Sequence, residues 1–160
     1  MIDTHAHLNE IEDVHRAILR AKDAGIKGIV AVGMDLLSNQ RTLDLASQFP
    51  EMVHPAIGYH PWSISQDTMD ENIQFIEKNL GSCIALGEVG IDYKTKVKKP
   101  LQWEIFSRIS SGPLYQWNTA FSIPPSFTIW CDLLWEKREW TITGRLYLNA
   151  MESSFEKISH

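Results

Sequence analysis

Met1-Ile-Asp-Thr-His-Ala-His-Leu8 opens the chain with an Asp and two histidines directly after a short apolar start. Side chains at positions i and i+2 of a β-strand project to the same face, so His5 and His7 can direct two imidazoles at one point. Imidazole suits Zn, Fe, Ni and Cu and also accepts Mn. In an arbitrary protein this spacing is more often a pair of surface histidines. Its position, where a first strand is expected to end, favours a metal site.

Strand and helix patterns alternate from this start to about residue 109. The expected strands cover residues 1–4, 26–32, 52–57 and 83–87. The expected helices cover residues 11–21, 38–49, 69–79 and 100–109. Asn9 is the expected cap of the first helix, and Pro100 suits the first turn of the last one. This alternation predicts an α/β fold with a parallel sheet and helices outside it.

Polar residues follow each of the four expected strands. They are His5 with His7, the stretch Gly33-Met-Asp35, His60, and Glu88 with Asp92. In parallel α/β folds the chemistry gathers at the carboxyl ends of the strands. Each cluster alone is compatible with an ordinary turn at a strand end. Four such clusters in succession favour a functional site.

The pattern changes after residue 109. Ser110-Ser-Gly-Pro113 interrupts the alternation, and four of the six tryptophans lie beyond it. We therefore divide the chain into a domain over 1–109 and a divergent tail over 110–160, in which no βα unit is evident. The tail is either an irregular or hairpin appendage or the product of a frameshift or alternative splicing, and the second explanation is favoured. We expect this tail to be the least ordered part of the molecule.

The composition, 44% hydrophobic and 22% charged over 160 residues, is typical of one soluble globular domain. A net charge of −5 argues against a strongly basic nucleic-acid surface, although a metal ion can supply local positive charge to a phosphate. A basic loop over 94–99 could meet a DNA backbone, while a solvated loop is the commoner outcome. Two distant cysteines, no signal peptide and no apolar run of ~20 residues favour a cytoplasmic or nuclear protein without a membrane span.

Three stretches together resemble the signatures of the TatD family of metal-dependent deoxyribonucleases, which belong to the amidohydrolase-like TIM barrels. They are Ile2-Asp-Thr-His-Ala-His-Leu8, Gly58-Tyr-His-Pro61 and Gly87-Glu-Val-Gly-Ile-Asp-Tyr93. The resemblance covers residues 1 to about 109. It implies a partial (β/α)8 barrel of about four βα units, and cleavage of DNA phosphodiester bonds by a water activated on Mg, Mn or Zn. A complete family member is expected to hold two such ions.

The same resemblance implies individual roles. His5 and His7 match the first metal ligands, and Glu88 matches a carboxylate that bridges two ions. His60 matches a histidine at the rim of the site, where it would contact substrate, and Asp92 a supporting polar residue of the glutamate loop. Each role has an alternative. His5 and His7 could be a surface pair, and Glu88 a carboxylate that caps the turn at a strand end. His60 could bond only to backbone, and Asp92 could be an ordinary turn residue.

Two further histidines and a final aspartate, which the family carries in later strands, have no counterpart in this sequence. A full (β/α)8 barrel needs roughly 250 residues. Two hypotheses follow: a TatD-type nuclease, or a truncated, non-catalytic isoform that retains part of the metal site. We expect little nuclease activity from this chain. The sequence leaves open the metal, the choice between DNA and RNA, and the oligomeric state.

Overall fold

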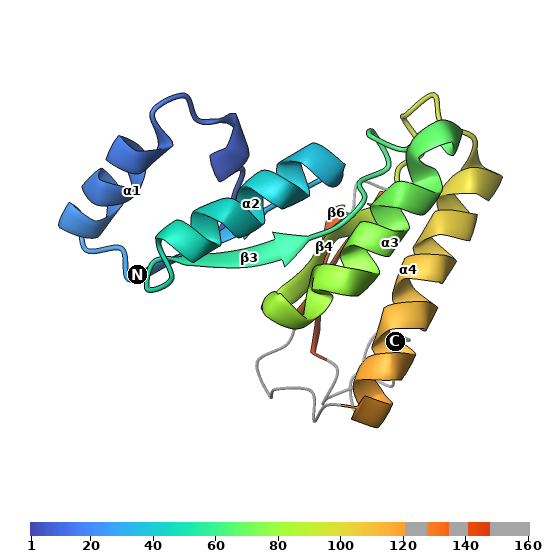
Figure 1. Ribbon diagram of the computed structural model, residues 1–160. Helices are drawn as coiled ribbons and strands as arrows, with labels where there is room; N and C mark the ends of the chain where they lie inside the picture. The colour runs from blue at the N-terminus through green and yellow to red at the C-terminus, as the bar shows by residue number, and fades with distance from the viewer. Residues whose placement is uncertain (121–127, 135–140, 148–160) are drawn as a thin grey trace, which may run out of the picture.

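A curled sheet of parallel strands forms the framework of the chain, and helices connect successive strands (Figure 1). The computed structural model describes the backbone of residues 1–120, 128–134 and 141–147, and the side chains of residues 1–109. The strands follow one another in the sheet in sequence order: β1 (Ile2–Ala6), β2 (Gly28–Val32), β3 (Val53–Ile57), β4 (Ala85–Ile91), β5 (Thr128–Leu134) and β6 (Thr141–Tyr147). The first five are parallel, and β6 is antiparallel to β5.

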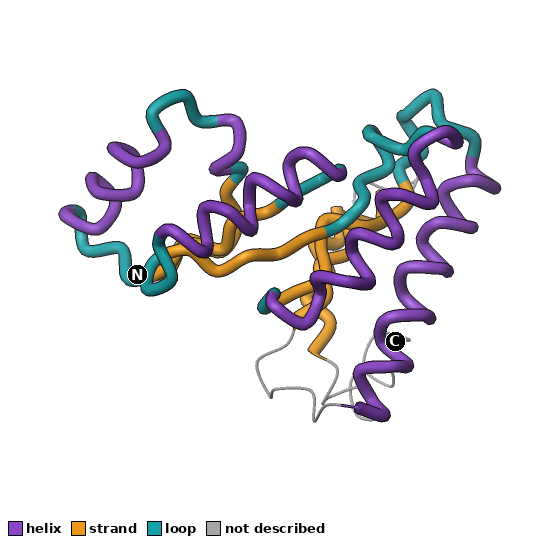
Figure 2. Tube along the Cα trace, viewed as in Figure 1, coloured by secondary structure: helices purple, strands orange, loops and turns teal. Residues whose placement is uncertain are grey.

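In the described part of the chain, the α-helices that accompany the sheet are α1 (Val14–Asp23), α2 (Leu36–Gln48), α3 (Met69–Asn79) and α4 (Lys99–Ala120). Short 3-10 turns cover Leu8–Glu10, Gln66–Thr68 and Leu80–Ser82. In Figure 2, α2 and α3 pass in front of the strands, so that one face of the curled sheet is covered by helices. Strands β1 to β4 with their helices match the predicted partial (β/α)8 barrel.

The helix starts follow from their capping residues. The Asp13 carboxylate accepts a hydrogen bond from the Arg16 amide at 3.3 Å, so α1 begins after Asp13. The prediction that Asn9 caps this helix is therefore wrong, because Asn9 lies inside the 3-10 turn that precedes it. Asp35 and Ser38 form a reciprocal capping box, which starts α2 two residues before the predicted position.

The core consists of two main apolar clusters beneath the helices. One joins α1 and α2 to the sheet and includes Ile18, Leu45 and Val53. The other joins α3 and α4 to β3 and β4 and includes Ile76 and Leu86. Every residue of β2 is buried, as expected for an inner strand of a parallel sheet covered by helices.

The backbone beyond residue 109 differs from the sequence prediction. Helix α4 continues through Ser110-Ser-Gly-Pro113 to Ala120, and β5 then pairs in parallel with β4. This segment therefore adds one more parallel strand, β5, and β5 then pairs with the antiparallel strand β6, as in the hairpin appendage that the sequence left open. Side-chain order in the tail lies outside the described residues, and the division at residue 110 stays a prediction. Within the described part of the chain, no helix is both long and apolar enough to cross a bilayer.

Candidate metal centre

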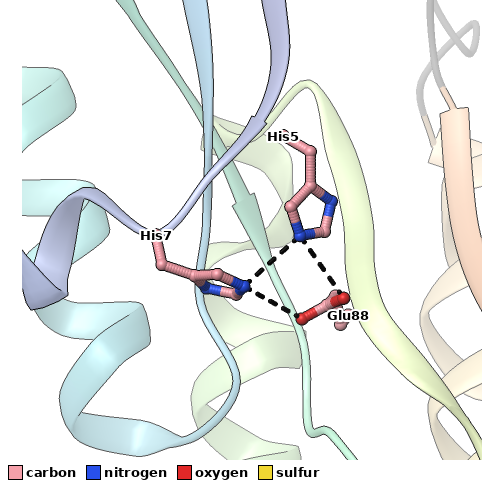
Figure 3. Close-up of side chains that lie close together, drawn as sticks. All are labelled: His5, His7 and Glu88. Atoms are coloured by element: carbon pink, nitrogen blue, oxygen red, sulfur yellow. Dashed lines mark hydrogen bonds and ion pairs between the residues drawn. The ribbon is translucent and has the colours of Figure 1, made fainter.

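Three side chains, two at the end of β1 and one in β4, meet at one point (Figure 3). His5 lies in β1, His7 follows that strand directly, and Glu88 lies in the middle of β4. The two imidazole Nε2 atoms are 3.3 Å apart. The Glu88 carboxylate approaches His5 Nε2 at 3.5 Å and His7 Nε2 at 3.6 Å. The curl of the sheet brings together residues more than eighty positions apart in sequence.

The spacing of these donor atoms fits a single divalent ion. Two ligands that bind one ion at ~2.0–2.2 Å with a tetrahedral angle lie about 3.3–3.6 Å apart. The Nε2–Nε2 separation falls in this interval, and so do the separations of Glu88 Oε1 from His5 and of Glu88 Oε2 from His7, so each carboxylate oxygen faces a different imidazole. Two imidazoles with one carboxylate form a mixed nitrogen and oxygen set that suits Zn or Mn. Among the residues with described side chains, this is the group of His, Cys, Asp and Glu with such geometry.

The orientation of His7 is set by the neighbouring strand. Its Nδ1 lies 3.2 Å from the carbonyl oxygen of Val32, the last residue of β2. A carbonyl can only accept, so Nδ1 carries the proton and donates it. In the neutral ring, Nε2 then holds a free lone pair directed at Glu88 and His5. The contact with Val32 therefore fixes which ring nitrogen of His7 faces the other two side chains.

Glu88 is held by its backbone against the end of β2. Its amide donates to the carbonyl of Gly33, the residue after β2, at 3.1 Å. Beyond the end of β3, β4 therefore contacts the segment that follows β2 directly. The backbone of Gly58 lies between them, and a β-carbon there would come within 2.6 Å of the Glu88 nitrogen. Real β-carbons do not approach other atoms so closely. The missing side chain at Gly58 is what allows Glu88 its position.

Asn39 of α2 fixes Gly58 in turn. Its side-chain amide donates to the Gly58 carbonyl at 2.7 Å, and its carbonyl accepts from the Gly58 amide at 3.1 Å. Asn39 is fully buried. Buried backbone groups at the end of β3, which no longer pair with a strand, are thus satisfied by one side chain. Asn39, Gly58 and Glu88 form a continuous support for the metal centre.

We expect Gly58→Ala to weaken divalent metal binding about tenfold and to lower the free energy of unfolding by about 1–3 kcal/mol, as overpacking does. The added methyl must push against Glu88 backbone, which cannot yield as a flexible side chain would. Isothermal titration calorimetry with Mn²⁺ and urea unfolding measure the two effects. Gly81→Ala is the matched control, because a β-carbon there meets nothing within 4 Å. Equal Mn²⁺ affinity and equal stability of the two variants would contradict the close approach of Gly58 to the Glu88 backbone.

His60 and Asp92 lie outside the three-residue group and form a second cluster around Trp62. The Trp62 indole Nε1 donates to the Asp92 carboxylate, and the Trp62 amide donates to His60 Nδ1 at 3.2 Å. Asp92 and His60 are both buried. The predicted roles of His60 at the rim and of Asp92 as a support stay predictions, and so do the metal-ligand roles of His5, His7 and Glu88.

Asp92 is an ionised carboxylate in this environment. Burial by itself raises its pKa, but hydrogen bonds from the Lys94 amide and the Trp62 indole, together with nearby His60 and Lys99, outweigh that effect. The pKa of Asp92 is therefore held below its ordinary value of 3.8. An ionised Asp92 is a firm acceptor for the indole at neutral pH.

Sequence reasoning missed two residues of this region. Asn39 falls in a helix where the pattern predicted only an amphipathic stripe, and a buried Asn facing the end of a strand was the available signal. Trp62 directly follows the His60-Pro61 pair, and a tryptophan in a turn among polar strand ends could have been singled out.

Comparison with known proteins gives a consistent result. The family model described as TatD related DNase matches residues 2–111. The chain is 34% identical over 113 residues to an uncharacterised metal-dependent hydrolase, YabD, of Bacillus subtilis, a match that covers 66% of this chain and 43% of that protein. It is 30% identical over 110 residues to the 3'-5' ssDNA/RNA exonuclease TatD of Yersinia pseudotuberculosis, with 66% and 42% covered.

A solved structure shares the fold. The crystal structure of a hydrolase TatD family protein from Entamoeba histolytica superimposes with a TM-score of 0.60 at 22% identity, and the match covers 76% of this chain and 47% of that one. The chain thus spans less than half the length of the curated relatives it matches.

Proposed function

Since the chain belongs to the TatD related DNase family, we propose that it is part of a metal-dependent hydrolase that cleaves phosphodiester bonds in nucleic acid. His5, His7 and Glu88 are its proposed metal ligands. The observation that carries the proposal is the meeting of their three donor atoms within 4.8 Å of one another. The relatives named for ssDNA, RNA or DNA cleavage support nucleic acid as the substrate class, with DNA as the expected one.

A divalent ion in this position would offset the negative charge of the phosphodiester and activate a water for attack. The protein residues prepare the place for it. Val32 holds the His7 ring with Nε2 available, and the Gly33 carbonyl holds the Glu88 backbone so that the carboxylate faces both imidazoles. Glu88 supplies the negative charge that a cation requires, and its side chain is 9% exposed beside imidazoles that are 34% and 28% exposed.

Metal binding without turnover is the second candidate function. The donor count among the described side chains favours it: His5, His7 and Glu88 form one candidate group, whereas the resemblance implies a two-ion site with further His, His and Asp ligands. Under this alternative the chain is a non-catalytic product of the same family that retains part of the site.

The deciding experiment measures metal binding and hydrolysis on the full chain. We expect Mn²⁺ or Zn²⁺ to bind in calorimetry, and His5→Ala to weaken that binding at least about tenfold, because one of three ligands is removed. His15→Ala is the matched control, since His15 is an exposed histidine of α1 that does not belong to the three-residue group. Hydrolysis is followed as nucleotide release from single-stranded DNA with Mg²⁺ or Mn²⁺.

The outcomes separate the candidates. Metal-dependent nucleotide release that His5→Ala abolishes supports the hydrolase. Metal binding that depends on His5 without nucleotide release favours the non-catalytic alternative. Metal binding unaffected by His5→Ala contradicts both.

A further inference from the structure

Trp62 exposes a large aromatic side chain beside the candidate metal centre. It lies in the turn after β3 and is 68% exposed, whereas the two polar residues that hold it, His60 and Asp92, are buried. Exposing an indole to water forgoes the free energy that its burial would contribute, about 1.5–3 kcal/mol for a large apolar side chain. Single exposed apolar side chains are common on protein surfaces, so what sets Trp62 apart is the way its ring is held.

The exposed ring is held in one orientation. Its N–H is used by the buried Asp92 carboxylate, its ring and the His60 ring form a T-shaped pair with a centroid distance of 5.1 Å and an angle of 89°, and its backbone amide donates to His60 Nδ1. The polar groups of Trp62 are thus satisfied within the protein. What remains for a partner is the flat face of the indole, already fixed before anything binds.

The turn that carries Trp62 lies at the same edge of the sheet as the metal centre. The His60 amide donates to the Met34 carbonyl at 2.9 Å. Gly33, the residue before Met34, accepts a hydrogen bond from the Glu88 amide. Asp92 in turn follows Glu88 by four residues, at the end of β4. Backbone contacts therefore connect the aromatic ring to the metal-ligand strand on both sides.

Basic residues adjoin the same cluster. The Lys94 amide donates to the Asp92 carboxylate at 2.7 Å, and Lys99 Nζ donates to the Asp92 backbone carbonyl at 3.2 Å. Lys99 also lies over the Tyr93 ring, 4.5 Å from its centre. An exposed aromatic ring near the Lys99 ammonium group combines the two elements that bind single-stranded nucleic acid: base stacking and positive charge for the backbone.

We propose that Trp62 is a stacking surface for a nucleobase of the nucleic acid substrate, positioned by Asp92 and His60 while the phosphodiester lies at the metal centre. The proposal rests on the proposed function. Stacking on an indole face tolerates any base, so Trp62 would select for unpaired nucleotides and not for sequence. A protein-docking surface fits less well, because such surfaces are contiguous apolar patches, and the described contacts of the Trp62 side chain are with a histidine and an aspartate.

The test compares two single-stranded probes on the full chain: a fluorescein-labelled phosphorothioate thymidine hexamer, and a hexamer of the same backbone without bases. Affinity is measured by fluorescence anisotropy in the presence of Mn²⁺. We expect Trp62→Leu to weaken binding of the thymidine hexamer about tenfold and to leave binding of the abasic hexamer unchanged. Trp62→Phe should restore most of the affinity, because it keeps an aromatic face.

Trp103→Leu is the matched control, since Trp103 is a 48% exposed tryptophan on α4. It should bind both hexamers as the unaltered chain does. Mn²⁺ titration calorimetry on Trp62→Leu reports separately whether the metal centre is intact.

Equal losses for both hexamers, or no loss for either with Trp62→Leu, would overturn the stacking role and leave the proposed hydrolase standing. The same holds if Trp103→Leu weakens thymidine binding as much as Trp62→Leu does. If the unaltered chain binds Mn²⁺ but neither hexamer, the stacking role and nucleic acid as the substrate class both fall.

Discussion

Replacing Glu88 with Gln is expected to weaken Mn²⁺ binding about 100-fold or more. The amide keeps the shape of the side chain but loses the negative charge that faces both imidazoles at 3.5 and 3.6 Å. Removal of residues that merely support a ligand typically costs 10–100-fold in metal affinity, so loss of a charged ligand should exceed that range. Titration calorimetry measures the loss of affinity. The pH is held fixed in these titrations, because protons compete with the metal for the histidines.

Glu77→Gln is the control for this substitution. It makes the same chemical change at an exposed position of α3 and should leave Mn²⁺ affinity unchanged. A Glu88→Gln chain that binds Mn²⁺ within a factor of three of the unaltered protein would show that the carboxylate is not a ligand. The meeting of the three side chains would then have to be explained by the hydrogen bonding of the histidines alone.

The position of His5 and His7 at the end of β1 was accessible from the sequence because it depends on local periodicity, whereas Glu88 lies within β4 and not at its end. A two-residue spacing directs both histidines to one side of β1, and parallel strands place their carboxyl ends at one edge of the sheet. The predicted α3 boundaries, Met69–Asn79, agree with the structure for the same reason. Local capping was less accessible, since both Asn9 and Asp13 are good cap residues and only the path of the chain selects Asp13.

The way Glu88 is supported was not accessible from the sequence. The pattern ended the fourth strand at Gly87, whereas β4 runs through Glu88 to Ile91. That extension depends on Gly33 after β2 and Gly58 after β3, which come together only through the register of three strands. Periodicity along one segment carries no information about such a contact. Gly33 and Gly58 could be recognised from the sequence as motif residues. The sequence does not show that the missing side chain at Gly58 leaves room for the Glu88 backbone.

Asn39 should link the stability of the fold to the metal centre. We expect Asn39→Leu to lower the free energy of unfolding by about 3 kcal/mol, because it leaves the buried amide and carbonyl of Gly58 without partners, at about 1–3 kcal/mol for each group. Leucine is close to asparagine in size, so the loss reports hydrogen bonding and not a large cavity. Urea unfolding followed by circular dichroism measures it.

The neighbouring Gln40→Leu serves as the control, since the Gln40 side chain is exposed on the same helix and bonds only to Asp44 in the described contacts. It should change the free energy of unfolding by less than about 0.5 kcal/mol, as surface substitutions do. Asn39→Leu should also weaken Mn²⁺ binding under conditions where the chain stays folded, because Gly58 loses the anchor that holds it against the Glu88 backbone. An Asn39→Leu chain that is destabilised yet binds Mn²⁺ with unchanged affinity would confine Asn39 to the fold. It would mean that the Gly33 carbonyl alone suffices to place Glu88 between the two histidines.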